Sequence, residues 1–197
     1  MRILGIDPGF RRLGYACVNA GESLSLETYG VVENTRLAAT KFNPHLNSGI
    51  EHLAVKVPKL LHETDPGYIV AEIVPAGKLG SNDSLVIAAI TTCKVIAYQF
   101  GVTWIDVAAN TLKKELTGDG KATKARVKNE VLSLFPEVDE AHILLKKSQK
   151  AEGEKATGFP QDVFDAIAAA VVGVKLLNGK EVQEVQEEQT DNSILSD

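Results

Sequence analysis

The chain of 197 residues is long enough for one domain of ordinary size and too short for two large ones. It is 44% hydrophobic and 24% charged, which supports a buried core and excludes a wholly disordered chain. Its two cysteines form no CxxC pair, which disfavours a disulfide scaffold and structural zinc. No apolar run is long enough for a bilayer, and the start, MRILGIDPGF, lacks the apolar core of a signal peptide, so we expect no membrane partner and a cytoplasmic location.

The net charge of −5 is unevenly distributed. Residues 180–197 hold one lysine and six acidic residues, so this segment alone accounts for the total, and the rest of the chain is neutral. Residues 111–128 hold six basic and two acidic residues, and such a local basic stripe is what phosphate binding needs. We therefore expect one domain over 1–179 and an acidic, mobile tail over 180–197.

The predicted elements alternate between strands and helices. Hydrophobic periodicity predicts strands over 2–7, 13–20 and 24–33, a helix over 46–64, a strand over 67–72, a helix over 82–99, a strand over 102–106, and helices over 108–116, 122–134 and 161–177. Residues 137–160 are polar and Lys-rich, which predicts a loop or insertion. The order predicts an α/β domain with a mixed five-stranded sheet, whose first three strands are antiparallel.

Four carboxylates stand at the ends of these predicted elements. Asp7 ends the first strand and Glu72 the fourth, while Asp162 and Asp165 share one face at the start of the last helix. If they converge at one sheet edge, their repulsion raises their pKa values, and a hard cation such as Mg²⁺ or Mn²⁺ relieves it. Two such ions about 4 Å apart could activate a water and stabilise the leaving oxygen of a phosphodiester.

Each carboxylate alone also has an ordinary structural interpretation. Asp7 precedes Pro-Gly and suits a turn, Asp162 suits a helix N-terminus, and Glu72 suits an exposed strand end. Asp165 is flanked by apolar residues, where a lone buried carboxylate is unfavourable. The four together favour a metal site.

The segment 117–124, TGDGKATK, is a second candidate site. Its two glycines let the backbone approach a phosphate, and the next helix offers free N–H groups at its N-terminus. A solvated connection is the alternative interpretation, and the spacing of a P-loop is absent.

These motifs support a resemblance to a known family. Residues 5–9 (GIDPG) with 14–16 (GYA) resemble the opening motif of RuvC-type Holliday junction resolvases, members of the RNase H-like superfamily. Residues 69–72 (IVAE), 117–127 and 162–168 (DVFDAIA) are similar to the family's second acidic motif, its GxGxAxKxxV segment and its DxxDAxA helix. The resemblance covers about 1–135 and 160–177, and it implies an RNase H-like fold with helices flanking the sheet.

The resemblance implies a homodimeric, Mg²⁺-dependent endodeoxyribonuclease of DNA recombination and repair. Such an enzyme makes paired, symmetric nicks in a four-way DNA junction, leaving 5′-phosphate and 3′-hydroxyl ends. Asp7, Glu72, Asp162 and Asp165 would bind the metal, and the helix over 82–99 would form the dimer contact. Lys113 and Lys124 would support cleavage, and further DNA contacts are expected at Arg11, Arg12, Lys78, Lys114, Lys121, Lys124 and Arg126. A branch-migration motor is a conceivable but not a required partner.

The chain also departs from the family pattern. No aromatic follows Glu72, where the family carries one that stacks on a base, which puts base stacking and cleavage-sequence preference in doubt. The longer 137–160 segment and the acidic tail suit a divergent, phage-encoded member that cuts branched DNA broadly.

Other functions share some of these features. A broader debranching nuclease and a ribonuclease acting on RNA–DNA hybrids would carry the same carboxylates. A junction-binding module without cleavage is disfavoured, because all four carboxylates are present. An actin-like ATPase also begins with a strand and Asp-x-Gly, but it needs two such domains, for which the chain is too short.

Overall fold

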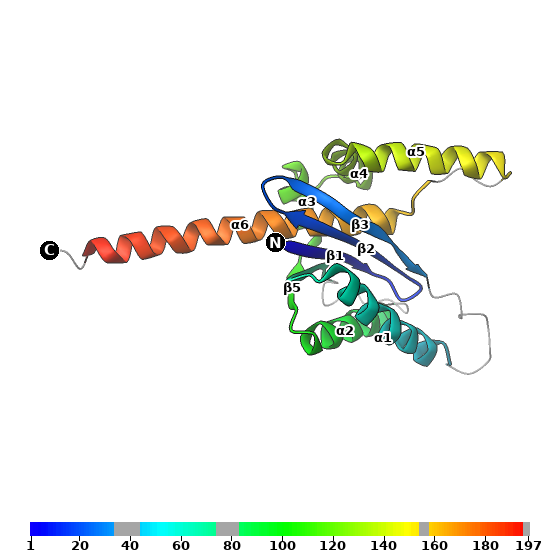
Figure 1. Ribbon diagram of the computed structural model, residues 1–197, viewed down its shortest axis with the longest axis horizontal. Coiled ribbons are helices and arrows are strands. Elements are labelled where there is room, and N and C mark those ends of the chain that lie inside the picture. The colour runs from blue at the N-terminus through cyan, green and yellow to red at the C-terminus, as the bar shows by residue number, and fades with distance from the viewer. Residues whose placement is uncertain (34–43, 74–82, 154–157, 195–197) are drawn as a thin grey trace.

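The computed structural model describes residues 1–33, 44–73, 83–153 and 158–194, of which 44–48, 83 and 180–194 are described by their backbone alone. Every predicted strand and helix is present in this part of the chain (Figure 1). The strands are β1 (Arg2–Pro8), β2 (Arg12–Ala20), β3 (Leu24–Glu33), β4 (Tyr68–Glu72) and β5 (Thr103–Val107). The helices are α1 (Pro44–Thr64), α2 (Asp83–Gln99), α3 (Ala109–Thr117), α4 (Lys124–Leu134), α5 (Pro136–Ala151) and α6 (Gln161–Ile194).

The five strands form one mixed sheet in the order β3-β2-β1-β4-β5. β1, β2 and β3 pair antiparallel as a meander, whereas β4 lies parallel to β1, and β5 lies parallel to β4. Parallel neighbours need a crossover, and α1 and α2 supply the two that lead to β4 and β5. The predicted mixed α/β sheet is confirmed.

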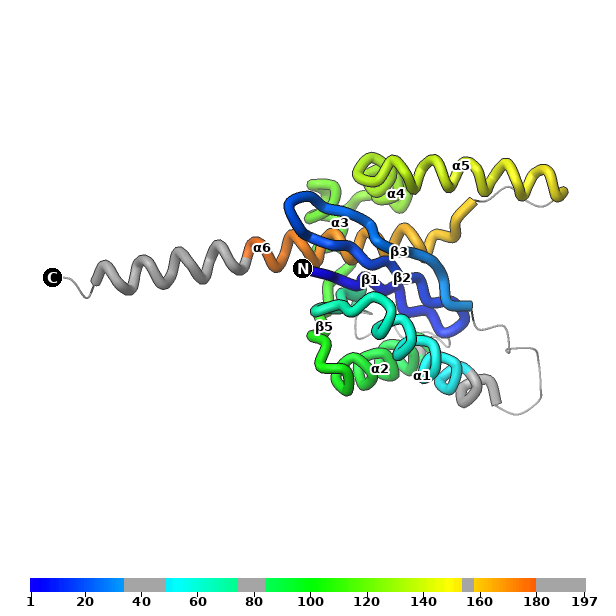
Figure 2. Tube along the Cα trace, in the orientation of Figure 1, coloured from blue at the N-terminus to red at the C-terminus, as the bar shows by residue number. Residues whose placement is uncertain are grey.

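Helices cover the two faces of the sheet (Figure 2). α1 and α2 pack on one face, and α6 packs on the other with α3 and α4. Successive side chains of a strand point to opposite faces, so Ile3 of β1 belongs to the α6 core and Leu4 to the α1–α2 core. By the same alternation, Asp7 and Glu72 stand on the α6 face, in step with Ile3 and Val70.

α6 lies unusually close to the sheet. A Cβ added at Gly5 of β1 would stand 2.0 Å from the carbonyl oxygen of Ala166, and one at Gly173 of α6 would stand 2.5 Å from Val70 Cγ2. Contact this close leaves no room for side chains at these glycines. The first turn of α6 is thereby held directly over the ends of β1 and β2.

Residues 137–160 are wrongly predicted as a loop, because most of them form α5. Pro136 occupies the first turn, where its missing N–H costs no helical hydrogen bond. The acidic side chains of Glu137 and Asp139 stabilise this end of the helix through its dipole. Val138 and His142 are buried one turn apart, which gives α5 a narrow inner face. Residues 154–157 of this segment lie outside the described residues.

α6 is also longer than predicted. The apolar pattern indicates an end near residue 177, but the backbone stays helical to Ile194. The side chains from 180 onward lie outside the described residues, so the boundary at 179 and the mobility of the acidic tail stay predictions. In the part of the chain that the structure describes, no helix combines the length and apolar character needed to cross a membrane.

Candidate active site

Asp7 and Glu72 are brought side by side by the register of two parallel strands. The β1–β4 ladder ends with Ile6 opposite Ala71, and Asp7 and Glu72 are the next residue on each strand. Both therefore stand on the same face at the same edge of the sheet. The predicted convergence of these two carboxylates is confirmed.

Asp162 and Asp165 lie on the first turn of α6, each beside a cation. Arg12 Nε is 3.0 Å from Asp162 Oδ2, and Lys124 Nζ is 3.6 Å from Asp165 Oδ2. Gln161 Nε2 donates a hydrogen bond of 2.9 Å to Asp165 Oδ1, a contact that the sequence analysis missed and that the i,i+4 spacing of the two residues could have indicated. Both aspartates keep about a quarter of their side chains exposed, so they remain accessible to a substrate.

The electrostatics of the site are those of crowded carboxylates. The pKa of Asp7 is raised from 3.8 to about 7, first by burial and then by the charges of Asp165, Asp162 and Glu72, against the lowering influence of Lys124. The pKa of Glu72 is also raised, first by partial burial and then by Asp165, against the lowering influence of Lys124 and Lys113. An added cation would favour the ionised form of both groups.

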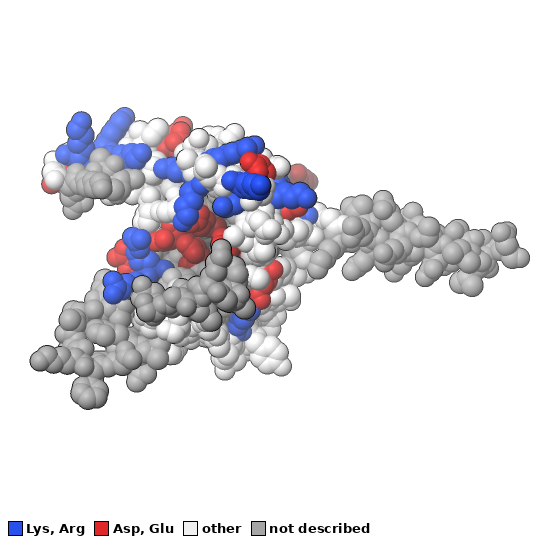
Figure 3. All heavy atoms as spheres, turned by 180° about the vertical axis from the view of Figure 1, so that it is seen from behind, with Lys and Arg blue, Asp and Glu red and all other residues white. Residues whose placement is uncertain are grey.

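Three of the four carboxylates open into one cavity of about 350 Å³. Its polar lining comprises Asp7, Glu72, Asp165, Lys113 and Lys124. On the face seen in Figure 3, acidic side chains gather in a central hollow with basic side chains along its borders. A second cavity, of about 390 Å³, holds Asp162 with Arg11 and Arg12 and shares Val86 with the first.

The donor set of this site fits a hard divalent cation. Its donors are carboxylate oxygens, which select Mg²⁺ or Mn²⁺ rather than zinc. Among the described residues, no three Asp, Glu, His or Cys side chains are spaced to hold an ion in their present orientations. Arg12 and Lys124 pair with Asp162 and Asp165, so an ion shared by all four carboxylates would compete with these two cationic side chains.

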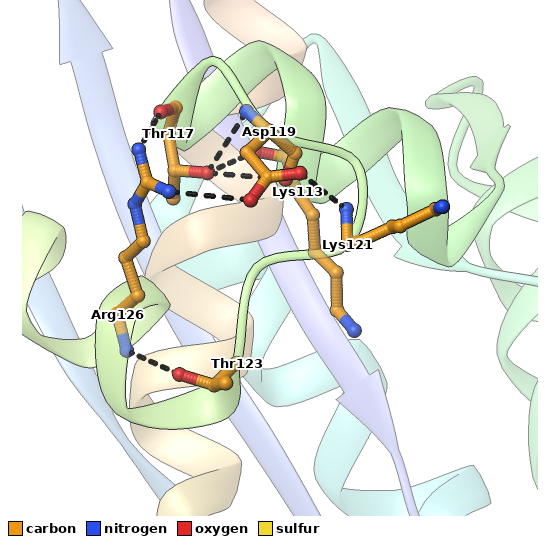
Figure 4. A network of polar contacts seen from close by, with 6 residues as sticks. All are labelled: Lys113, Thr117, Asp119, Lys121, Thr123 and Arg126. Carbon is orange, nitrogen blue, oxygen red and sulfur yellow. Dashed lines mark hydrogen bonds and ion pairs between the residues drawn. The ribbon is translucent and has the colours of Figure 1, made fainter.

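The Gly-rich segment forms a compact turn between α3 and α4 (Figure 4). Arg126 donates one hydrogen bond to the carbonyl of Thr117 and another, of 3.2 Å, to Asp119 Oδ2. The side chain of Thr123 caps α4 by accepting from the Arg126 amide. Arg126, predicted to contact DNA, therefore holds this turn in shape.

The other predicted DNA contacts are divided over the surface. Lys113 and Lys124 line the acidic cavity, and Arg11 and Arg12 line the second one. Lys114 and Lys121 are exposed on α3 and on the turn after it. Lys78 lies outside the described residues.

The sequence profile described as "Crossover junction endodeoxyribonuclease RuvC" matches residues 3–173. The chain belongs to this family. A RuvC from Maricaulis maris is 30% identical over 179 residues, which cover 87% of this chain and 89% of the relative. A RuvC from Gloeobacter violaceus is 29% identical over 88% of this chain and 87% of its own. The predicted family and the predicted endodeoxyribonuclease class are confirmed.

Solved structures of similar proteins share the fold. The Thermus thermophilus RuvC structure superimposes with a TM-score of 0.66 at 22% identity, covering 87% of this chain and 92% of that one. Its complex with a Holliday junction substrate gives a TM-score of 0.67 over the same shares. The yeast mitochondrial Holliday junction resolvase gives 0.57 at 16% identity, over 86% and 76% of the two chains. The predicted RNase H-like fold is confirmed.

Proposed function

We propose that this RuvC-family chain resolves four-way DNA junctions by paired, symmetric nicks, through Mg²⁺-dependent hydrolysis of phosphodiesters in recombination and repair. The observation that carries the proposal is the cavity in which Asp7, Glu72 and Asp165 face Lys113 and Lys124. Carboxylates able to hold a cation, with lysines beside them able to meet a phosphate, are the groups that this hydrolysis needs.

The roles of the residues follow from their places. Asp7, Glu72, Asp162 and Asp165 would hold Mg²⁺, with Mn²⁺ as a substitute, which would supply an activated water and neutralise charge on the leaving oxygen. Lys124 stands 3.6 Å from Asp165 and would exchange this partner for a phosphate oxygen as the carboxylate takes up its metal role. Lys113, on the same cavity wall, would add positive charge beside the scissile phosphate.

DNA would reach the site over the basic borders of the two cavities. Arg11 and Arg12 line the second cavity. Lys114 is exposed on α3, and Lys121 is exposed on the turn between α3 and α4. These side chains would contact phosphates, which position a duplex without reading its sequence. We place junction cleavage by this chain in the cytoplasm, and cleavage does not need a branch-migration motor.

A homodimer through α2 would match the two-fold symmetry of a four-way junction. Three large hydrophobic side chains of α2 are exposed, Ile87 at 42%, Val95 at 53% and Tyr98 at 86%, which supports this surface as the contact. Light scattering should give a dimer mass for the wild type. We expect Val95→Glu, which puts a charge into an apolar interface, to shift the mass to that of a monomer.

The test of the function is cleavage of a labelled synthetic four-way junction with and without Mg²⁺. A linear duplex and an RNA–DNA hybrid serve as alternative substrates, and Asp7→Asn serves as the inactive control. Paired nicks in the junction alone, dependent on the metal, are the expected result. Cutting of flaps and three-way junctions as well would identify a debranching nuclease, and tight binding without cutting in any metal would contradict the proposal.

A further inference from the structure

His142 is a buried imidazole, 2% exposed, where three helices meet. It belongs to α5, and its ring packs edge-on against Phe164 of α6 at a centroid distance of 5.3 Å. On its other side it lies 5.8 Å from the ring of Phe159, in the segment that enters α6. Its Nε2 atom lies 2.8 Å from Nζ of Lys128 on α4. One side chain thus touches α4, α6 and the entry to α6.

The hydrogen bonds of His142 determine where its proton lies. The backbone N–H of Phe159 donates to Nδ1 over 2.9 Å, so Nδ1 must be the unprotonated nitrogen of a neutral ring. Nε2 then carries the proton, and it faces Nζ of Lys128 across 2.8 Å. The pKa of Lys128 is lowered by burial and by Lys146, against Asp139, and that of His142 is lowered by burial and by both lysines.

The segment held by His142 leads directly to the aspartates of the site. Phe159 lies three residues before Asp162, and Phe164 is the residue before Asp165. Gln149 lies seven residues after His142, on the same face of α5, and its side-chain oxygen accepts a hydrogen bond of 2.8 Å from the Gly158 amide. A side chain at Gly158 could not fit, because its Cβ would stand 2.3 Å from the imidazole, and its φ of +68° suits glycine.

His142 also connects this segment to the lysine of the site. Lys128 lies four residues after Lys124 on α4, so the two share one face of that helix. Lys124 in turn pairs with Asp165 across the cavity. The contacts of His142 therefore join the helix that carries Lys124 to the helix that carries Asp162 and Asp165.

We propose that His142, assisted by Gln149, is a positioning residue for cleavage: it fixes the entry to α6 so that Asp162 and Asp165 meet Asp7 and Glu72. The role rests on the proposed function. His142 touches neither the substrate nor the four carboxylates, and it acts through the backbone of residues 158–159 and through Phe164. A displacement of about 1 Å at a catalytic group can reduce the rate about 100-fold, which is the scale of effect that this support would control.

The experiment compares His142→Leu, His142→Asn and Gln149→Ala with the wild type. Leucine fills the space but accepts no hydrogen bond, whereas the Oδ1 atom of asparagine stands near the place of Nδ1 and can accept from Phe159. Ser148→Ala is the matched control on α5, because the exposed Ser148 hydroxyl donates a hydrogen bond of 2.8 Å to the exposed Glu152. Single-turnover cleavage, junction affinity, melting temperature and the amide-exchange rate of Phe159 are measured for each protein.

We expect His142→Leu to lower the cleavage rate about 10- to 100-fold with junction affinity within about threefold, and His142→Asn to recover much of the rate. Gln149→Ala should have a smaller effect of the same kind, and ¹⁵N NMR of the wild type should show the Nε2–H tautomer of His142. Wild-type rates in folded His142→Leu and Gln149→Ala, or an Nδ1–H tautomer, would overturn the proposal. A wild type that cleaves no junction would overturn the proposed function itself, and the NMR and exchange data would still report on the contact.

Discussion

Gly14 of β2 lies directly against the backbone of Asp162, so that a Cβ at Gly14 would stand 2.1 Å from the Asp162 carbonyl oxygen. Real Cβ atoms do not approach a backbone oxygen this closely. The absence of a side chain on one strand therefore sets how near the first turn of α6 comes to the sheet. A residue with no chemistry of its own thus decides where a candidate metal ligand stands.

Gly14→Ala should displace the start of α6, since the clashing atom belongs to the backbone and cannot rotate away. Overpacking of this kind costs about 1–3 kcal/mol of the free energy of unfolding. We expect cleavage to fall by more than this loss of stability explains, because Asp162 moves with its backbone. Thermal melting and junction cleavage check both effects.

Gly21→Ala is the matched control for this substitution. Gly21 lies between β2 and β3, and no atom would stand within 4 Å of a Cβ added there. Its stability and activity should stay near those of the wild type. Equal losses in the two variants would contradict the role given to the Gly14 contact.

Asp7→Asn should stabilise the metal-free protein more at pH 8 than at pH 4. The folded-state pKa of Asp7 is about 7, above its ordinary 3.8, so the folded chain holds a proton that the unfolded chain releases between these values. The wild type therefore loses stability as the pH rises across this window, at no more than about 1.4 kcal/mol per pH unit. Asparagine carries no such proton. Urea unfolding in EDTA at several pH values measures the difference, and a constant difference would contradict the pKa shift.

The cleavage rate should rise with pH through a midpoint near 7 when Mg²⁺ is limiting. A divalent cation needs the ionised carboxylate, and burial and neighbouring charges raise the pKa of Asp7 to about 7. More Mg²⁺ should move the midpoint to lower pH, because the cation favours the ionised form, and EDTA should abolish cleavage. A rate independent of pH between 5.5 and 8.5 at limiting Mg²⁺ would speak against the assigned metal site.

Lys124→Ala should weaken junction binding and also shift the pH profile. Loss of one phosphate contact reduces the slope of log K against log salt by about 0.9. Lys124 lowers the pKa values of Asp7 and Glu72, so its removal should move the midpoint of cleavage to higher pH. Lys59→Ala is the control, since Lys59 lies on α1 and pairs with Glu63 at 3.7 Å. A salt slope equal to that of the control would remove Lys124 from the DNA-binding surface.

The strands and their carboxylates were predictable because their signals are local. The short continuous apolar runs ending in Asp7 and Glu72 indicate both the strand and its last residue, and parallel pairing puts such ends at one edge. The partners of the aspartates were not predictable in this way. That Arg12 reaches Asp162 depends on the close approach of α6 to β2, which no pattern within either segment contains.

α5 escaped prediction for a different physical reason. Only Val138 and His142 are buried along it, too few to give a 3.6-residue apolar pattern among so many lysines. The histidine itself stands in no motif of the sequence, so no local pattern marks it as buried. Its importance lies in contacts with Lys128, Phe159 and Phe164, which tertiary structure alone assembles.

The tight seat of α6 on the sheet also fixes the angular phase of that helix. Asp162 lies against Gly14, Ala166 and Ala170 against Gly5, and Gly173 against Val70, at intervals of four, four and three residues along one stripe. One residue inserted between Asp165 and Gly173 would rotate one end against the other by about 100°. Either the aspartates or the core would then face the wrong way. In this helix, the spacing between the aspartates and Gly173 is therefore constrained as strictly as the residues themselves.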